Sequence, residues 1–282
     1  MQTKTAERPH ALRTQHPSWQ DVVRSPPRPA HIVQICDSDE VLVEGAGYFV
    51  SEGLDAGEAV ILTGTQDHMS GIRRVLRSRG ANPDVYERRG QLVFTDAEEA
   101  VNHVLEGDVP DRARFEALAA SVMEPLYNDT RWAGLRWWGE MSNVFNKRGL
   151  STAVVHDEEI GDGICRKYGL RLMCSFQCDR FDPQNYNGCL QEVCARHTHV
   201  IPAEDYALHR VAVNRAVADV LGEIKGAALQ SLLSWKALSC EMPSSQAVLF
   251  WLRDTMPEYL PAVLARARAY HRSTMRRTEV GG

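Results

Sequence analysis

The chain of 282 residues lacks the features that would place it in a membrane or a secreted class. No apolar run approaches the roughly 18–20 residues of a membrane-spanning helix, and no stretch within residues 1–30 resembles a secretory signal. Seven cysteines are an odd number in a chain long enough to fold without crosslinks, so reduced thiols are expected. These absences predict a cytoplasmic globular protein that does not enter a membrane.

The sequence also lacks the common catalytic motifs. A P-loop needs glycines and a lysine after the first strand, to wrap and neutralise phosphates. That position holds CDSDEVLV, whose acids Asp37, Asp39 and Glu40 would repel a triphosphate. No G-x-S-x-G elbow, H-E-x-x-H zinc motif or dinucleotide glycine fingerprint is present either. We therefore expect neither an enzyme nor a bound cofactor.

Charge is distributed unevenly along the chain. Residues 1–30 carry five basic and two acidic residues, residues 31–206 carry 17 and 29, and residues 207–282 carry 10 and six. Because phosphate binding needs a positive face, we do not expect the acidic centre to bind nucleic acid. Most of this charge is expected to be solvated surface.

Three segments are expected from the pattern of residue types. Residues 1–30, with five prolines, predict a flexible N-terminal arm. Residues 31–206 alternate predicted strands with predicted helices, which favours a three-layer α/β sandwich around a mostly parallel sheet. The expected strands include HIVQIC, AVILT, one or two within VYERRGQLVF, GLRWWGEM, TAVVHD and LRLMCSF, and Gly53 is expected to end the first long helix.

Residues 207–282 show no strand pattern and predict a helical C-terminal extension. Apolar residues recur there at a period near 3.6, broken at Pro243, and a further helix starts at Pro257 or Pro261. The apolar stripe packs either on the rest of the chain, on a regulatory protein partner or on a second copy.

Several stretches in order resemble one family. HIVQICDSDEVL, YFVSEGLDAGEAVIL, GLRWWGEM, LMCSF and EVCARHTHVIPAEDY are similar to the MEDS domain (methanogen/methylotroph, DcmR-type sensory domain), over about residues 31–206. The resemblance implies a RecA/KaiC-like core that senses small organic molecules and is often attached to histidine kinases or transcription regulators. The extension contains neither a kinase ATP-binding box nor a convincing helix-turn-helix, so the output is left open.

A ligand pocket is expected at the carboxyl ends of the parallel strands, where ligands gather in open α/β sheets. Along GLRWWGEM, Arg136, Trp138 and Glu140 point one way, and the arginine and carboxylate are expected to pair, either to fix the sheet or to orient a ligand. His156 is expected at the end of TAVVHD, as a pocket residue or a hydrogen-bonded core residue. The predicted ligand-binding residues are Cys36, Asp37, Arg136, Trp138, Glu140, His156, Cys174 and His197.

Residues 174–199 hold four cysteines and two histidines. Cys174 and Cys178 on an extended strand lie about 13 Å apart, too far to share one zinc ion. Cys194 and His197 are three apart and would share a helix face. Buried sulfur in a core, a reactive thiol and a metal site all remain open. The alternative metal set, for zinc or another transition metal, is Cys174, Cys194, His197 and His199.

Together these patterns predict a non-catalytic sensor that binds a small organic ligand and signals through its C-terminal helices. A metal- or redox-responsive regulator that uses the cysteine and histidine cluster is the alternative.

Overall fold

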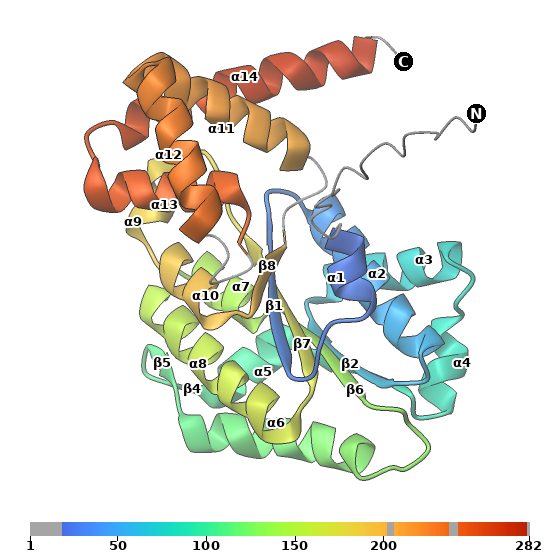
Figure 1. Ribbon diagram of the computed structural model, residues 1–282. Coiled ribbons are helices and arrows are strands. Elements are labelled where there is room, and N and C mark those ends of the chain that lie inside the picture. The colour runs from blue at the N-terminus through green and yellow to red at the C-terminus, as the bar shows by residue number, and fades with distance from the viewer. Residues whose placement is uncertain (1–18, 202–205, 237–241, 281–282) are drawn as a thin grey trace, which may run out of the picture.

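Short apolar segments form the strands of a six-stranded sheet in the computed structural model, which describes residues 19–201, 206–236 and 242–280 (Figure 1). Every pairing in this sheet is parallel, in the order β3-β2-β6-β7-β1-β8. β1 and β2 are buried along their whole length, as is typical of parallel strands covered on both faces. The strands are β1 (Ala30–Cys36), β2 (Ala59–Gly64), β3 (Leu92–Asp96), β6 (Leu135–Gly139), β7 (Arg171–Gln177) and β8 (His199–Ile201).

Helices cover both faces of the sheet, so the core has three layers. One face packs against α1 (Trp19–Arg24), α2 (Asp39–Asp55), α3 (Gln66–Ser78) and α4 (Pro83–Arg88). The other packs against α5 (Ala97–Val104), α6 (Arg112–Tyr127), α7 (Met141–Lys147), α8 (Ser151–Tyr168) and α10 (Leu190–Arg196). Between α5 and α6 lies a two-stranded ribbon of β4 (Leu105–Glu106) and β5 (Val109–Pro110), and α9 (Pro183–Asn187) precedes α10.

Local signals explain where the helices begin and end. The hydroxyl of Ser38 accepts a hydrogen bond from the Val41 amide at 3.3 Å and caps α2. This helix runs past Gly53, the expected end, to Asp55, and Gly57 follows with a φ of 71°. Gly53 serves close packing instead, because a Cβ there would lie 2.6 Å from the Cδ of Arg136.

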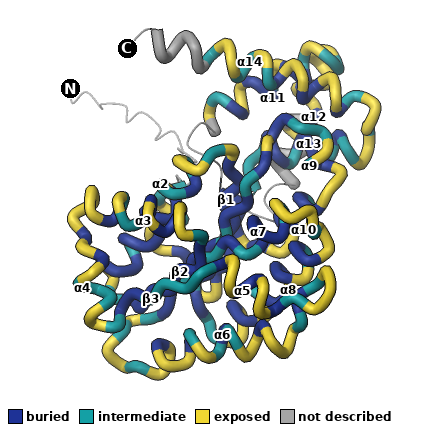
Figure 2. The backbone as a smooth tube through the Cα atoms, turned by 180° about the vertical axis from the view of Figure 1, so that it is seen from behind, coloured by how far each residue is buried: buried dark blue, intermediate teal, exposed yellow. Residues whose placement is uncertain are grey.

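The C-terminal extension consists of α11 (Tyr206–Leu221), α12 (Glu223–Lys236), α13 (Ser244–Thr255) and α14 (Leu260–Val280). Its apolar residues belong to the same buried cluster as the α5–α8 face of the sheet, and buried residues run from the sheet into the extension (Figure 2). Within the described part of the chain, no helix combines the length and the apolarity needed to cross a bilayer.

The expected α/β class, with its mostly parallel sheet and helical appendage, is confirmed. Two local predictions were wrong. VYERRGQLVF, expected as strands, contains α4 before β3, and TAVVHD is the start of α8. The flexible arm predicted for residues 1–30 was wrong for residues 19–24, which form a helix with Val23 buried. Residues 1–18 lie outside the described part of the chain. The domain boundaries at residues 30 and 206 stay predictions.

Candidate functional site

The predicted ligand-binding residues lie on opposite faces of the sheet. Side chains alternate along a strand, and Cys36 and Trp138 belong to the cluster under α1–α4. Cys174 belongs with the cluster under α5–α8. The sheet therefore separates the predicted set, and no single pocket can hold all of it.

Glu140 follows β6 at the carboxyl edge of the sheet, where its carboxylate is fully used by neighbours. One oxygen accepts from the Thr65 amide at 2.6 Å and from its hydroxyl at 3.0 Å. The other accepts from Nδ1 of His68 at 2.7 Å and the Asn143 amide at 3.3 Å. Four donors fill the four acceptor positions of a carboxylate, so Glu140 fixes the strand ends and has little capacity left for a ligand.

His68 extends this network toward α2. Its Nε2 lies 3.2 Å from Oδ1 of Asp39, while its Nδ1 faces Glu140. Burial opposes the charged imidazole, but the hydrogen bond to Glu140 outweighs it and raises the pKa of His68. The hydrogen bond from Gln177 and that from His68 lower the pKa of Asp39. The network ties the carboxyl ends of β2, β6 and β7 to α2.

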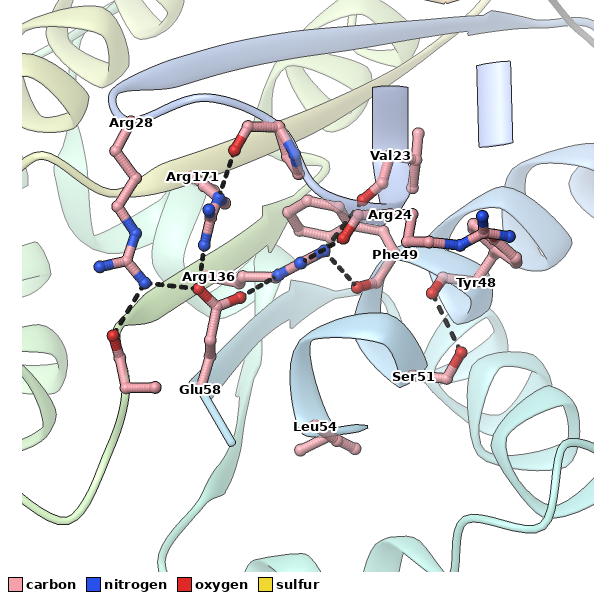
Figure 3. A network of polar contacts seen from close by, with 12 residues as sticks. Val23, Arg24, Arg28, Tyr48, Phe49, Ser51, Leu54, Glu58, Arg136 and Arg171 are labelled. Carbon is pink, nitrogen blue, oxygen red and sulfur yellow. Dashed lines mark hydrogen bonds and ion pairs between the residues drawn. The ribbon is translucent and has the colours of Figure 1, made fainter. Parts of the chain in front are cut away.

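The predicted pair of Arg136 with Glu140 was wrong, because Arg136 lies at the opposite, amino-terminal edge of the sheet. It pairs there with Glu58, which precedes β2 (Figure 3). Its guanidinium also donates to the Val23 carbonyl at 3.0 Å, the Phe49 carbonyl at 3.2 Å and the Arg24 carbonyl at 2.8 Å. Arg136 therefore holds α1 and α2 against the sheet.

Glu58 receives two further arginines. Arg28 donates to it at 2.6 Å, and Arg171 of β7 forms a second ion pair with the same oxygen (Figure 3). Burial would raise the pKa of Glu58, but Arg136 and the other two arginines lower it. This pairing could not be predicted from the sequence, since Glu58 stands 78 positions before Arg136.

Cys36, Asp37 and Trp138 also have structural neighbours. The Trp138 indole donates to the Ser175 hydroxyl at 3.0 Å, and Asp37 pairs with Arg180 at 3.0 Å. Burial raises the pKa of the Cys36 thiol well above its usual value. None of these three residues lines the cavities described below.

His156 does not lie at a strand end, where it was expected. It lies on the exposed side of α8. The β-branched residues of TAVV imitate a strand, but the buried positions follow a helical spacing. These buried positions of α8 are Ala153, Val154, Asp157, Glu158, Ile160, Ile164 and Cys165.

A groove lies at the carboxyl ends of β2 and β3, between the sheet, α5 and α6. Its volume is about 500 Å³. Aromatic and aliphatic side chains make most of its wall, and Asp96, Glu99 and His103 add polar groups. The wall includes Thr63, Phe94, Phe115, Leu118, Ala119, Val122, Trp137 and Met141.

A smaller cavity of about 50 Å³ adjoins this groove toward β7 and α8. Thr63, Phe115, Trp137 and Met141 line both spaces, so the two are adjacent. The far end of the smaller cavity is polar. It is formed by Ser142, Asp157, Glu158 and Cys174.

Behind this polar end, four side chains from separate elements converge on one point: His31, Glu158, Cys174 and His197. Their potential ligand atoms all lie within 4.8 Å of one another. Nε2 of His31 is 3.5 Å from Oε2 of Glu158 and 3.4 Å from Sγ of Cys174. Nε2 of His197 is 3.2 Å from the same Glu158 oxygen, and the two imidazole rings stack with centroids 3.9 Å apart.

Burial governs protonation in this cluster. Burial and the neighbouring His197 lower the pKa of His31 to about 3, so its ring is neutral near pH 7. Burial, with the charges of Glu158 and Asp157, raises the pKa of the Cys174 thiol. Burial would raise the pKa of Glu158 too, but His197 and the surrounding hydrogen bonds lower it to about 2.

Asp157 and Glu158 share one hydroxyl, that of Ser142, which contacts Asp157 and lies 2.7 Å from Oε1 of Glu158. Burial and the charge of Glu158 raise the pKa of Asp157 to about 8. A hydroxyl carries one proton, so Ser142 can donate to only one of these two carboxylates at a time.

The metal set expected from sequence shares only Cys174 and His197 with this cluster. Cys194 is buried in α10 but is not among the converging residues. His199 pairs in register with Ile32, whose side chain faces α1–α4, so it lies on the other face of the sheet from Cys174. His31 and Glu158 were missed, although a histidine on the core side of HIVQIC and an acid at a buried helical position could have indicated them.

Comparison with known proteins gives a family match. Residues 30–198 match the family described as the MEthanogen/methylotroph, DcmR Sensory domain (MEDS). A search of the curated proteins finds no match. Among solved structures, a KaiC-like protein from the hyperthermophilic archaeon Pyrococcus horikoshii OT3 is similar at 11% identity, over 62% of this chain and 71% of that one, with a TM-score of 0.41.

Proposed function

The chain belongs to the MEDS family of sensory domains, and from that premise we propose that it is a non-catalytic cytoplasmic sensor of a small organic molecule. The ligand enters the groove between the sheet, α5 and α6, and its effect reaches a regulatory protein or a second copy through the C-terminal helices. The observation that carries the proposal is the pair of adjacent cavities, whose walls are mostly apolar and include a few polar side chains.

The size and lining of the groove suit such a ligand. Binding sites for small molecules are mostly apolar clefts of about 300–1,000 Å³ with a few placed polar groups. The groove, at about 500 Å³, falls within that range. Phe115 and Trp137 offer flat apolar walls, and the carboxyl-edge position is the usual one in open parallel sheets.

The loop after β1 supports recognition without phosphate chemistry. Ser38 caps α2, Asp37 pairs with Arg180, and Asp39 contacts His68 and Gln177. These acids stand where a P-loop would supply glycine amides and a lysine. The six described cysteines are all free thiols, which suits the reducing cytoplasm.

β7 offers a direct route from the cavity to the C-terminal helices. Cys174 lines the cavity, and the chain after this strand reaches Tyr186, which is fully buried against the extension. Arg253 donates to the Tyr186 carbonyl at 3.0 Å, and Arg268 pairs with Asp179 at 2.6 Å. A ligand signals only if it binds one arrangement of these contacts more tightly than another.

Screening small organic compounds by tryptophan fluorescence tests the proposal, because Trp137 lines both cavities. Leu118→Trp, at a partly buried position, should fill the groove and abolish binding of a hit while the melting temperature changes little. Val41→Trp, at a partly buried position on the opposite face, is the matched control and should retain binding. Equal loss in both variants, or binding unaffected by Leu118→Trp, would contradict the assignment of the groove.

A bound hit should also alter the extension. Hydrogen exchange in α13 and α14 should change when the compound binds, and Leu118→Trp should remove that change. Unchanged exchange there at saturation would refute the proposed route of signalling while leaving the binding site itself in place.

A further inference from the structure

We propose that His31, Glu158, Cys174 and His197 form a binding site for one divalent transition-metal ion, with Zn²⁺ the best suited. The four side chains come from β1, α8, β7 and the end of α10. This inference goes beyond the sensor function and does not depend on it.

The spacing of the donor atoms fits a tetrahedral ion. Zinc bonds of about 2.0–2.1 Å to nitrogen or oxygen and about 2.3 Å to sulfur place neighbouring ligand atoms roughly 3.3–3.8 Å apart. The cluster shows 3.2 Å and 3.5 Å from the two histidine nitrogens to Glu158, and 3.4 Å from His31 to the thiol of Cys174. These three pairs stand close to the distances that an ion would impose, and the other pairs lie within 4.8 Å.

In both histidines, a backbone carbonyl contacts the ring nitrogen that faces away from the proposed ion. Nδ1 of His197 lies 2.6 Å from the Val193 carbonyl, and Nδ1 of His31 lies 3.3 Å from the Arg196 carbonyl. Each carbonyl can only accept, so each Nδ1 carries a hydrogen and each ring turns its Nε2 toward Glu158. Metal-binding histidines characteristically have such a partner on the second ring nitrogen.

Glu158 is oriented in the same way. Ser142 holds its Oε1 at 2.7 Å, which leaves Oε2 facing the two histidines. Nε2 of His197 is buried and has no hydrogen-bond partner among the described residues, although Oε2 lies 3.2 Å away. The four potential ligand atoms thus converge on one point, and a cation there would satisfy all of them.

The donor set selects the kind of ion. One thiolate, two imidazoles and one carboxylate suit Zn²⁺ and related first-row ions, whereas Mg²⁺ and Ca²⁺ prefer oxygen ligands alone. Four protein donors complete a tetrahedron, which is typical of a structural zinc site. Such an ion would pin four elements that are distant in sequence, at the polar end of the smaller cavity.

The rival explanation is a proton shared between His197 and Glu158 with no metal. Titrating the chelator-stripped full chain with Zn²⁺ by calorimetry, and with Co²⁺ by absorption, separates the two. We expect one ion per chain and a cobalt spectrum with thiolate charge-transfer and tetrahedral bands. X-ray absorption of the zinc-loaded protein should show one sulfur and three nitrogen or oxygen neighbours.

Variants locate the ion. Cys174→Ser should weaken Zn²⁺ binding by at least about 100-fold, since loss of an outer partner alone commonly costs 10–100-fold. Cys194→Ser is the matched control, a buried thiol outside the cluster, and should bind as the parent does. A parent that binds no ion, full binding by Cys174→Ser, or equal loss in Cys194→Ser would overturn the proposal.

The X-ray absorption result decides the matter even if Cys174→Ser fails to fold. An ion with no sulfur neighbour, or with two, would place it elsewhere and refute the site. Because none of these measurements uses an organic ligand, failure here leaves the sensor proposal standing, and failure of the fluorescence screen leaves the metal site standing.

Discussion

Replacing Arg136 by methionine should lower the free energy of unfolding by about 3–5 kcal/mol, the usual cost of removing one partner from a buried ion pair. Arg136 is 1% exposed. Methionine keeps much of the apolar stem but donates nothing to Glu58 or to the carbonyls of Val23, Phe49 and Arg24. At about 2–4 °C per kcal/mol, the melting temperature should fall by roughly 6–20 °C.

Urea unfolding measures this loss, and Arg131→Met provides the control. Arg131 is an exposed arginine whose ion-pair partner, Asp129, is two residues away, so its loss should change stability far less. Two carbonyl partners of Arg136 lie in α1, so hydrogen exchange over residues 19–29 should also increase in Arg136→Met. Equal effects of the two substitutions, or unchanged exchange in that segment, would refute the view that Arg136 holds α1 to the sheet.

Three further predictions concern the same framework. The pKa of Glu58 is lowered, so Glu58 stabilises the fold fully above its unfolded pKa of 4.5, and this stabilisation is lost as pH falls through the folded pKa. The difference in urea midpoint between the parent and Glu58→Gln should therefore become smaller in acid. A difference that grows in acid would contradict the stabilising role of the three arginines around Glu58. The pKa of His68 is raised, so His68 stabilises the fold fully below its unfolded pKa of 6.5, and this stabilisation is lost as pH rises through the folded pKa. The stability of the parent relative to His68→Gln should therefore decrease in alkali. A pKa of His68 below 6.5 in an NMR titration would contradict this. Gly53→Ala should lower the free energy of unfolding in urea by about 1–3 kcal/mol, since its methyl group would overlap Arg136. Gly57→Ala is the control: no atom lies within 4 Å of its new methyl group, so it reports only the cost of a positive φ.

The sequence predicted the layers of the fold well because alternating strands and helices carry their own periodicities. It failed at TAVVHD because two or three β-branched residues satisfy either pattern over so short a stretch. Only the longer spacing, through Ile160 and Ile164, shows that α8 is a helix.

The candidate site was predicted less completely, for a geometric reason. The alternation of side chains along a strand shows which residues of that strand share a face, but it does not show which faces of two different strands lie on the same side of the sheet. Thus Arg136 and Cys174 were grouped although the sheet separates them. His31 and Glu158 meet only because strand order brings β1 beside β7 and α8 packs across both, and that order cannot be read from one sequence.

The shortness of β8 leaves most of one edge of β1 without a strand partner. This three-residue edge strand covers β1 only at Ile32, Val33 and Gln34, and His197 stands two positions before it. If His197 lost its contacts, β8 would detach from β1 and expose a hydrophobic strand edge, which favours pairing with other chains. Aggregation on heating should therefore begin at this margin of the sheet, before the rest of the domain unfolds.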